Sequence, residues 1–216
     1  MSQRNFTIGF IVILILVAIT LGISKLSQNQ TTAPTPFPSA SAENTPPALS
    51  ASSSAKLNKY SKFPGVLPDA GLINKKAVIE TPKGKIEFEI YPEASKAASN
   101  FIFLANDGFY DGLTFHRVVP KFVIQGGDPA GNGTGGPGYK FEDEPVTKQY
   151  KKGIVAMANS GPNTNGSQFF IMLEDNLTLP PNYTIFGKVT KGQDVVDKIA
   201  VGDVMTKVTI EPLKNP

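Results

Sequence analysis

A segment of small and polar residues divides this chain into a part that can fold and a part that cannot. Of the 25 residues from 31 to 55, 21 are Ser, Thr, Ala or Pro, and Phe37 and Leu49 are its only large apolar side chains. Such a composition buries too little apolar surface to offset the entropy that ordering costs. We therefore predict a disordered linker over residues 26–62 and a folded domain over residues 63–216.

An apolar run precedes the linker. Residues 6–23 are eighteen consecutive uncharged and mostly apolar positions, which as a helix would span about 27 Å, close to the thickness of a bilayer core. The sequence that follows, SKLSQNQ, lacks the small-x-small site of a cleaved signal peptide. We predict that residues 1–25 form a single-pass signal anchor that holds the domain at the outer face of the cell membrane. The alternative is a cleaved signal peptide and a secreted domain.

Composition excludes several classes of site. The chain has no cysteine, which rules out disulfides, thiol nucleophiles and cysteine-bound zinc, and it has one histidine, His116. Residues 63–216 carry sixteen basic and seventeen acidic side chains, so the predicted domain shows no basic excess for nucleic acid. We expect no cofactor, no metal and no nucleic-acid partner.

The predicted domain is mainly β. Ile86, Phe88 and Ile90 alternate with glutamates, and a Pro-Lys-Gly turn precedes them, which predicts a hairpin with one exposed face. An apolar stripe after Pro92 predicts a helix that ends near Gly108, and a second short helix is predicted over residues 193–200. Further β-like runs cover residues 113–119, 122–125, 154–158, 167–172, 184–189 and 204–211. Eight strands and two helices favour a closed antiparallel β-barrel capped by the helices.

Arg117 is conspicuous in the composition. The chain has two arginines, Arg4 and Arg117, and nineteen lysines. A guanidinium is a planar, permanently charged fork, whereas an ammonium is a flexible point charge, so an isolated Arg in a Lys-rich chain suggests that geometry matters there. The alternative is that Arg117 pairs with a carboxylate at a strand end.

Two segments carry a resemblance to a known family. Residues 115–129 are FHRVVPKFVIQGGDP and residues 157–171 are MANSGPNTNGSQFFI. Along their whole length they resemble the cyclophilin-type peptidyl-prolyl cis/trans isomerases, and the resemblance extends over about residues 76–211. It implies a barrel capped by helices, an isomerase that acts on X–Pro bonds, and partners that are proline-containing peptides and unfolded or folding proteins. We expect a monomer.

The resemblance also implies the roles of individual residues. Arg117 would be catalytic, and the proline pocket would contain Phe122, Val123, Phe170 and Leu179. Gln125, Ala158, Asn159 and Ser160 would hold the peptide backbone, and Gln168 would orient the arginine or the substrate. Tyr183 would line the groove. His116 either lines the groove or packs at a strand end. Without the resemblance, the four apolar residues would be assigned to the core, and Gln125 and Asn159 could satisfy buried backbone groups.

The sequence departs from many eukaryotic cyclophilins beside the pocket. Thr178 stands where many have a tryptophan, Tyr183 where a histidine is frequent, and Val123 where a methionine is frequent. Loss of the indole removes contact area and an N–H donor, so we expect weak binding of cyclosporin. An alternative function is a tethered proline-peptide-binding chaperone module with little catalytic turnover.

Overall fold

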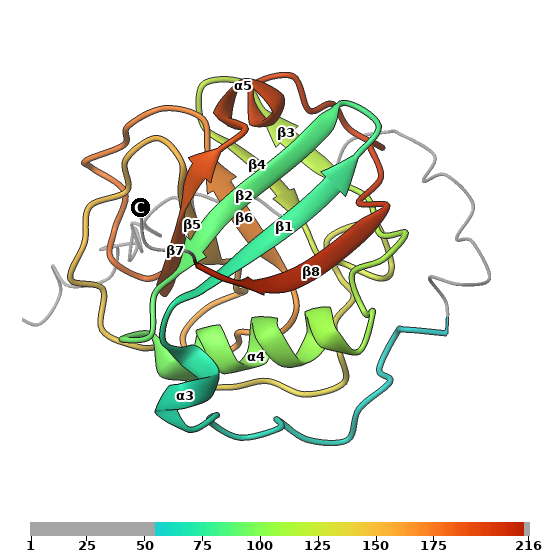
Figure 1. The fold of residues 1–216 in the computed structure, drawn as a ribbon, viewed down its shortest axis with the longest axis vertical. Helices are drawn as coiled ribbons and strands as arrows, with labels where there is room; N and C mark the ends of the chain where they lie inside the picture. Colours follow the sequence, from blue (N-terminus) through green and yellow to red (C-terminus); the bar gives the residue numbers. More distant parts are fainter. Residues whose placement is uncertain (1–54, 214–216) are drawn as a thin grey trace, which may run out of the picture. The chain divides into compact units, whose positions relative to one another are not determined.

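The computed structural model describes residues 55–213, which are the coloured part of Figure 1. The expected anchor over residues 1–25 and most of the expected linker lie outside the described residues. Within the described residues, no helix has both the length and the apolar character to cross a membrane.

The predicted hairpin is confirmed. Strand β1 (Lys75–Thr81) pairs antiparallel with β2 (Gly84–Ile90), with Thr81 opposite Gly84 at the turn. Ile86, Phe88 and Ile90 are buried, as the period of two predicts, because successive side chains of a strand point to opposite faces. One face of the hairpin thus contributes to the core.

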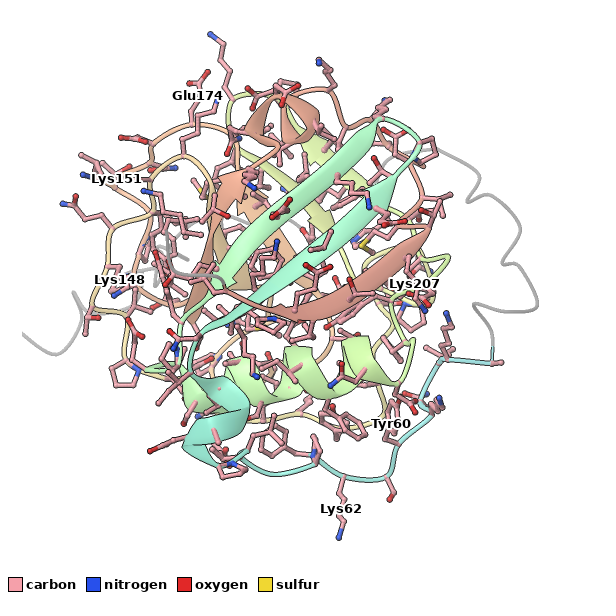
Figure 2. The ribbon with its side chains drawn as sticks, in the orientation of Figure 1. Tyr60, Lys62, Lys148, Lys151, Glu174 and Lys207 are labelled. Carbon is pink, nitrogen blue, oxygen red and sulfur yellow. The ribbon has the colours of Figure 1, made fainter. Side chains whose placement is uncertain are left out.

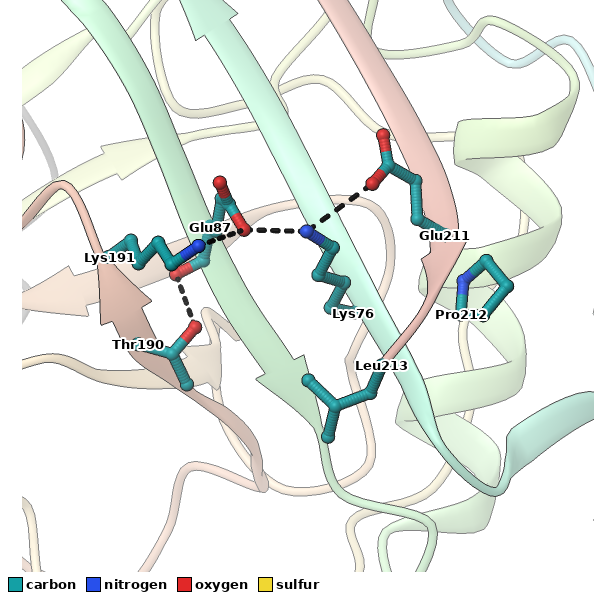
Figure 3. Close-up of a pocket in the computed structure, with 7 residues that line it drawn as sticks. All are labelled: Lys76, Glu87, Thr190, Lys191, Glu211, Pro212 and Leu213. Carbon is teal, nitrogen blue, oxygen red and sulfur yellow. Dashed lines mark hydrogen bonds and ion pairs between the residues drawn. The ribbon is translucent and has the colours of Figure 1, made fainter. Parts of the chain in front are cut away.

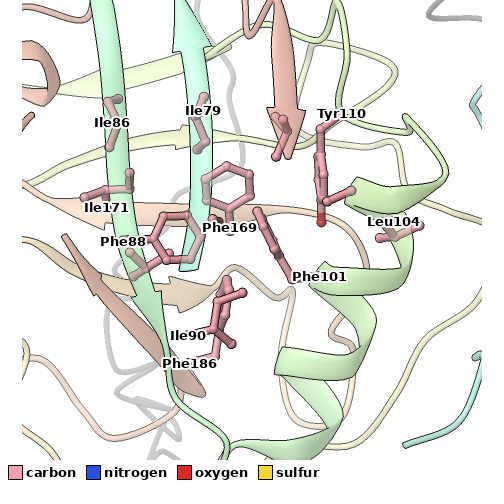
Figure 4. Packing of buried hydrophobic residues seen from close by; sticks show 14 of the residues in the cluster. Ile79, Ile86, Phe88, Ile90, Phe101, Leu104, Tyr110, Phe169, Ile171 and Phe186 are labelled. Carbon is pink, nitrogen blue, oxygen red and sulfur yellow. The ribbon is translucent and has the colours of Figure 1, made fainter. Parts of the chain in front are cut away.

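Eight antiparallel strands form one curved sheet in the order β3-β4-β6-β5-β7-β2-β1-β8. The remaining strands are β3 (Arg117–Val119), β4 (Val123–Gly126), β5 (Ile154–Met157), β6 (Phe169–Met172), β7 (Ile185–Lys191) and β8 (Lys207–Pro212). The main cluster of buried apolar side chains lies between the sheet and the helix of residues 95–106, as Figure 4 shows.

The expected closed barrel is not completed by a β-ladder. Among the described residues, β3 and β8 are the two edge strands. The segments just before them are joined by an isolated β-bridge between Thr114 and Val204. The physical reason is local: Phe115 donates to the carbonyl of Asp203, and Met205 donates to that of Leu113, in an irregular pattern. The strand expected over residues 113–119 therefore begins only at Arg117.

Helices cover the two openings of the sheet. Helix α4 (Ser95–Asn106) lies across one opening, and the single turn α5 (Gln193–Val196) lies at the other (Figure 1). A further turn, α3 (Asp69–Leu72), precedes β1. Helix α5 is shorter than the expected residues 193–200, because Lys198 and Ile199 donate to carbonyls three residues earlier and tighten the chain into turns.

A distant carboxylate caps helix α4. Its N-cap residue, Ala94, has no side-chain acceptor, and the first N–H groups of a helix need a partner from outside it. Glu144 supplies that partner, because its two carboxylate oxygens accept from the backbone N–H groups of Lys96 at 2.8 Å and Ala97 at 2.9 Å. The loop that precedes β5 is thereby attached to the helix.

Two apolar clusters lie on opposite faces of the strands that carry the two motifs. In β6, Phe169 and Ile171 belong to the main core between the sheet and α4, whereas Phe170 and Met172 belong to a second cluster. Because successive side chains of a strand alternate, one short strand supplies both clusters. The second cluster is where the candidate site lies.

Candidate active site

Arg117, Gln125 and Phe170 form a row across three neighbouring strands. Arg117 is opposite Gln125 in the β3–β4 register, and Gln125 is opposite Phe170 in the β4–β6 register. Directly opposed residues of antiparallel strands project from the same face. Since Phe170 belongs to the second cluster, the guanidinium of Arg117 is on the side of that cluster and not on the side of the main core.

A chain of hydrogen bonds connects this row to the glycine-rich loop of residues 126–138. Nη1 of Arg117 donates to Oε1 of Gln125 at 3.2 Å, and Nε2 of Gln125 donates to Oε1 of Gln168 at 2.9 Å. Nε2 of Gln168 then donates to the carbonyls of Gly133 at 3.0 Å and Gly135 at 2.9 Å. The side-chain amides of Gln125 and Gln168 are thus each held in one orientation. Gln168 fixes the amide of Gln125 so that its oxygen faces Arg117.

An apolar cluster lies beside the row. Val123 and Phe170 belong to it, together with Leu179 and Tyr183 from the segment before β7. The rings of Phe170 and Tyr183 meet edge to face with centroids 5.7 Å apart, an arrangement that aromatic pairs prefer. Phe122 is partly buried against the same cluster. These residues provide an apolar surface of the kind that a pyrrolidine ring requires.

Tyr150 fixes the position of Tyr183. The hydroxyl of Tyr150 donates to the carbonyl of Tyr183 at 2.9 Å and accepts from its backbone N–H at 3.0 Å. Both groups of the Tyr183 backbone are therefore bonded to one buried side chain. Sequence reasoning did not single out Tyr150, which lies outside both motifs.

The cation and the phenol of the site influence each other. Burial lowers the pKa of Arg117 from its usual value, and the hydroxyl of Tyr183 opposes that shift. Burial raises the pKa of Tyr183 to about 12, and the charge of Arg117 opposes that shift. Arg117 therefore remains a cation in a partly desolvated environment, where its hydrogen bonds and charge act more strongly than in bulk water.

The carboxylate of Asp128 organises the glycine-rich loop. It accepts from the backbone N–H groups of Ala130, Asn132 and Gly133. Gly135 lies so close to this carboxylate that a Cβ atom there would collide with Oδ1 of Asp128 and with the backbone of Ala130. The loop is therefore shaped around Asp128, and its glycines allow the close approach that places two carbonyls against Gln168.

Ala158, Asn159 and Ser160 lie at the end of β5. Ala158 is buried in the second cluster, and Ser160 is exposed. Nδ2 of Asn159 donates to the carbonyl of Asn182 at 2.9 Å. Asp143, which sequence reasoning did not single out, accepts from Asn165 at 2.7 Å and from the backbone of Asn163 at 2.8 Å, and so holds the turn that follows Ser160.

His116 differs from the other predicted site residues. Both of its ring nitrogens are buried and have no hydrogen-bond partner among residues 55–213. Burial lowers the pKa of His116; the charge of Asp128 opposes this and that of Arg117 adds to it. Within the described part of the chain, His116 therefore has buried, unpaired ring nitrogens, unlike the exposed hydrogen-bonding groups that a residue lining a groove would offer.

A hollow lies on the outer face of the sheet, on strands β7, β2, β1 and β8, whereas the row lies on β3, β4 and β6. Lys76, Glu87, Lys191 and Glu211 line it, and Figure 3 shows Lys76 between the two carboxylates. Nζ of Lys76 is 2.6 Å from Glu87 and 3.3 Å from Glu211. The charges of this hollow are paired with each other, so we do not consider it the candidate site. The described residues contain no cluster of side chains suited to a metal ion.

Comparison with known proteins identifies the family. A profile of the family described as cyclophilin type peptidyl-prolyl cis-trans isomerase/CLD matches residues 76–215. The chain belongs to the cyclophilin family. This cyclophilin is accordingly a member of an isomerase class of enzymes, as the two sequence motifs predicted.

Relatives and solved structures agree with that assignment. Peptidyl-prolyl cis-trans isomerase B of Bacillus subtilis is 53% identical over 130 residues, which cover 59% of this chain and 91% of the relative. A peptidyl-prolyl cis-trans isomerase of Helicobacter pylori is 47% identical over 137 residues, covering 61% and 84%. The crystal structure of a Cryptosporidium parvum cyclophilin type isomerase matches this cyclophilin with a TM-score of 0.60 and 33% identity, covering 66% of this chain and 99% of the other. A second crystal structure of that protein, in the presence of the dipeptide Ala-Pro, has a TM-score of 0.59.

Proposed function

We propose that this cyclophilin accelerates X–Pro isomerisation by directing the guanidinium of Arg117 at the prolyl nitrogen. The uncatalysed barrier is about 18–20 kcal/mol, because rotation breaks the conjugation of the amide. When the amide twists, the nitrogen lone pair becomes available as an acceptor, and a donor aimed at it stabilises the transition state more than the ground state.

The observation that carries this proposal is the row of Arg117, Gln125 and Phe170 on one face of the sheet. It sets a preoriented cation next to the apolar cluster that we propose contacts the proline ring. Gln125 is bonded to Gln168 as well as to Arg117, so little reorganisation is needed when the substrate twists. The crystal structure of the Cryptosporidium parvum relative in the presence of Ala-Pro adds support for a prolyl ligand.

The test is the isomerisation rate of a proline-containing tetrapeptide with the full-length chain. Arg117→Ala should lower kcat/KM by about 100-fold, the cost of removing a donor to a developing charge. Arg117→Lys keeps the charge but not the fork, so it should recover only a part of the activity. Lys188→Ala, which removes an exposed cation from β7, is the control for net charge. Equal rates for the wild type and Arg117→Ala would remove Arg117 from this role.

A second candidate function is a tethered module that binds prolyl segments with little turnover. The apolar cluster beside Arg117 supports this candidate, because apolar contact with a proline ring does not depend on whether the amide twists. An assay of aggregation of a proline-rich unfolded protein separates the two functions. Protection that persists in Arg117→Lys, together with negligible isomerase activity of the wild type, would favour the binding module.

We also propose that the domain acts outside the cytoplasm. The eighteen-residue apolar run over residues 6–23 and the segment of small and polar residues after it support this proposal. Cell fractionation, combined with N-terminal sequencing of the mature protein, tests it. Recovery in the membrane fraction with the first residues intact indicates an anchor, and a shortened chain outside the cells indicates secretion. A full-length chain in the cytoplasmic fraction would refute the proposal.

A further inference from the structure

Residues 56–63, which we call the strap, lie against the domain although the sequence places most of them in the linker. Figure 1 shows this segment passing beside α4 towards α3. The backbone N–H of Asn58 donates to the carbonyl of Gly136 at 3.1 Å, and that of Tyr60 donates to the carbonyl of Pro137 at 2.8 Å. The strap is thus hydrogen-bonded to the far end of the glycine-rich loop.

Tyr60 anchors the strap. Its ring packs edge to face on Phe103 of α4 with centroids 5.2 Å apart, and it also approaches Phe109 at 6.0 Å and Tyr139 at 6.2 Å. Its hydroxyl donates to Asp107 at 2.6 Å. Burial and this carboxylate raise the pKa of Tyr60 above its usual value. These four contacts attach the Tyr60 ring to the domain, whereas most other side chains of the strap are exposed.

The far end of the strap continues this contact. The ring of Phe63 stacks on Phe141 with centroids 5.1 Å apart and meets Tyr139 at 6.0 Å. In contrast, Figure 2 shows Lys62 pointing away from the domain, and its side chain is exposed. The strap therefore has one attached side and one exposed side.

Gly138 shows that the loop and the strap are fitted to each other. Its φ of +108° is a conformation that L side chains rarely adopt. A Cβ atom at this position would also collide with the carbonyl oxygen of Tyr60 and would lie 3.0 Å from the backbone of Asn58. A glycine is needed here because the strap lies directly on the loop.

The loop transmits this contact to the candidate site. Gly136, which accepts from Asn58, directly follows Gly135, whose carbonyl accepts from Gln168. Gln168 in turn holds the amide of Gln125, and Gln125 holds Arg117. A continuous series of hydrogen bonds and one covalent step therefore runs from the strap to the guanidinium.

We propose that the strap positions the catalytic arginine, by fixing the carbonyls of the glycine-rich loop that orient Gln168. The inference rests on the isomerase function proposed above. The strap precedes residue 76, where the match to the family begins, so it lies outside the matched region. It also places the last residues before the domain in direct contact with the loop that serves the site.

The test compares full-length variants in the tetrapeptide assay. Tyr60→Ala should lower kcat by about five-fold and leave KM within about two-fold. KM should change little because the apolar residues proposed to bind the proline ring belong to a different cluster from the one against which Tyr60 packs. Tyr60→Phe retains the ring and should keep near wild-type kcat. Lys62→Ala, an exposed position of the same strap, is the matched control. Circular dichroism should show each variant folded at the assay temperature, and Tyr60→Leu replaces Tyr60→Ala if that variant is not.

A double-mutant cycle distinguishes positioning from general destabilisation. If the strap acts through Gln168, adding Tyr60→Ala to Gln168→Ala should produce no further loss of kcat, whereas independent effects would multiply. Unchanged kcat in Tyr60→Ala, or multiplied losses in the double variant, would overturn the inference. Absence of activity in the wild type would instead contradict the proposed isomerase function.

Discussion

Gln125 lies directly opposite Arg117 across β3 and β4, and its Oε1 atom accepts a hydrogen bond of 3.2 Å from the guanidinium. The same amide donates to Gln168, which forces its oxygen, and not its nitrogen, to face Arg117. The direction of this amide is therefore set by the protein before any substrate binds.

Gln125→Met should lower kcat/KM by about ten-fold, because it removes one net hydrogen bond from the guanidinium and keeps the side-chain volume. The tetrapeptide assay measures it. Gln149→Met, at an exposed position, is the control. Full activity in Gln125→Met would show that the amide does not orient Arg117.

Leu179→Ala should raise KM for prolyl peptides by about ten-fold, through loss of apolar contact in the pocket. Leu177 offers a matched control on the same loop, since it is 63% exposed whereas Leu179 is 8% exposed. Titration with a proline-containing peptide by NMR gives the affinities. A similar loss in both variants would mean that the loop, and not the pocket contact, is responsible.

Stability should fall as pH decreases through the titration of His116. Burial lowers its pKa in the folded protein below the usual 6.5, with Asp128 opposing the shift and Arg117 adding to it. Between the two pKa values, the unfolded chain binds a proton at this histidine and the folded chain does not. The free energy of unfolding therefore rises with pH across that interval, and the stabilisation is lost as pH falls through it. Urea denaturation at about pH 7.5 and about pH 5 should show a smaller decrease for His116→Gln than for the wild type. Equal decreases would contradict this assignment, since the chain has no other histidine.

Glu144→Ala should reduce the free energy of unfolding by about 2 kcal/mol, because it leaves the first N–H groups of α4 without their acceptor. Glu142→Ala removes a nearby carboxylate that is 66% exposed and pairs with Lys96, and it should cost less than about 1 kcal/mol. Denaturant unfolding of both variants tests the difference. Comparable losses of unfolding free energy in the two variants would indicate that the change in net charge, and not the loss of the helix cap, causes the destabilisation.

Cyclosporin should bind weakly. Thr178 is exposed, and its hydroxyl is bonded to Oδ1 of Asn176 at 3.0 Å, so this position supplies neither an indole surface nor an indole N–H. Calorimetry measures the dissociation constant. Low-nanomolar binding, or no gain of affinity in Thr178→Trp, would refute this explanation.

The elements that could be predicted are those whose signal is local. The alternation of Ile86, Phe88 and Ile90 identified β2, and the two motifs located the strands that bear Arg117 and Phe170. The contacts between the two edges of the sheet could not be predicted in the same way. The pairing of residues 113–115 with residues 202–205 depends on how the sheet curves and not on either segment alone.

The strap and the cap of α4 show a second reason for what was missed. Composition over a long window indicated disorder up to residue 62, yet Tyr60 and Phe63 find aromatic partners that are distant in sequence. Glu144 is likewise nearly fifty positions from the helix that it caps. Such contacts leave a trace in the sequence only as single unexplained residues: two aromatics beside a tract of small side chains, and one carboxylate before a strand.

The two clusters that share β6 have a consequence for how this protein can diversify. Substitutions at Phe170 or Met172 alter the cluster beside Arg117, where we propose that a prolyl ligand binds, whereas those at Phe169 or Ile171 alter the main core beneath α4. In a saturation library over these four codons, substitutions at Phe170 and Met172 should respond to selection for new peptide preferences. Substitutions at Phe169 and Ile171 should respond to selection for heat resistance.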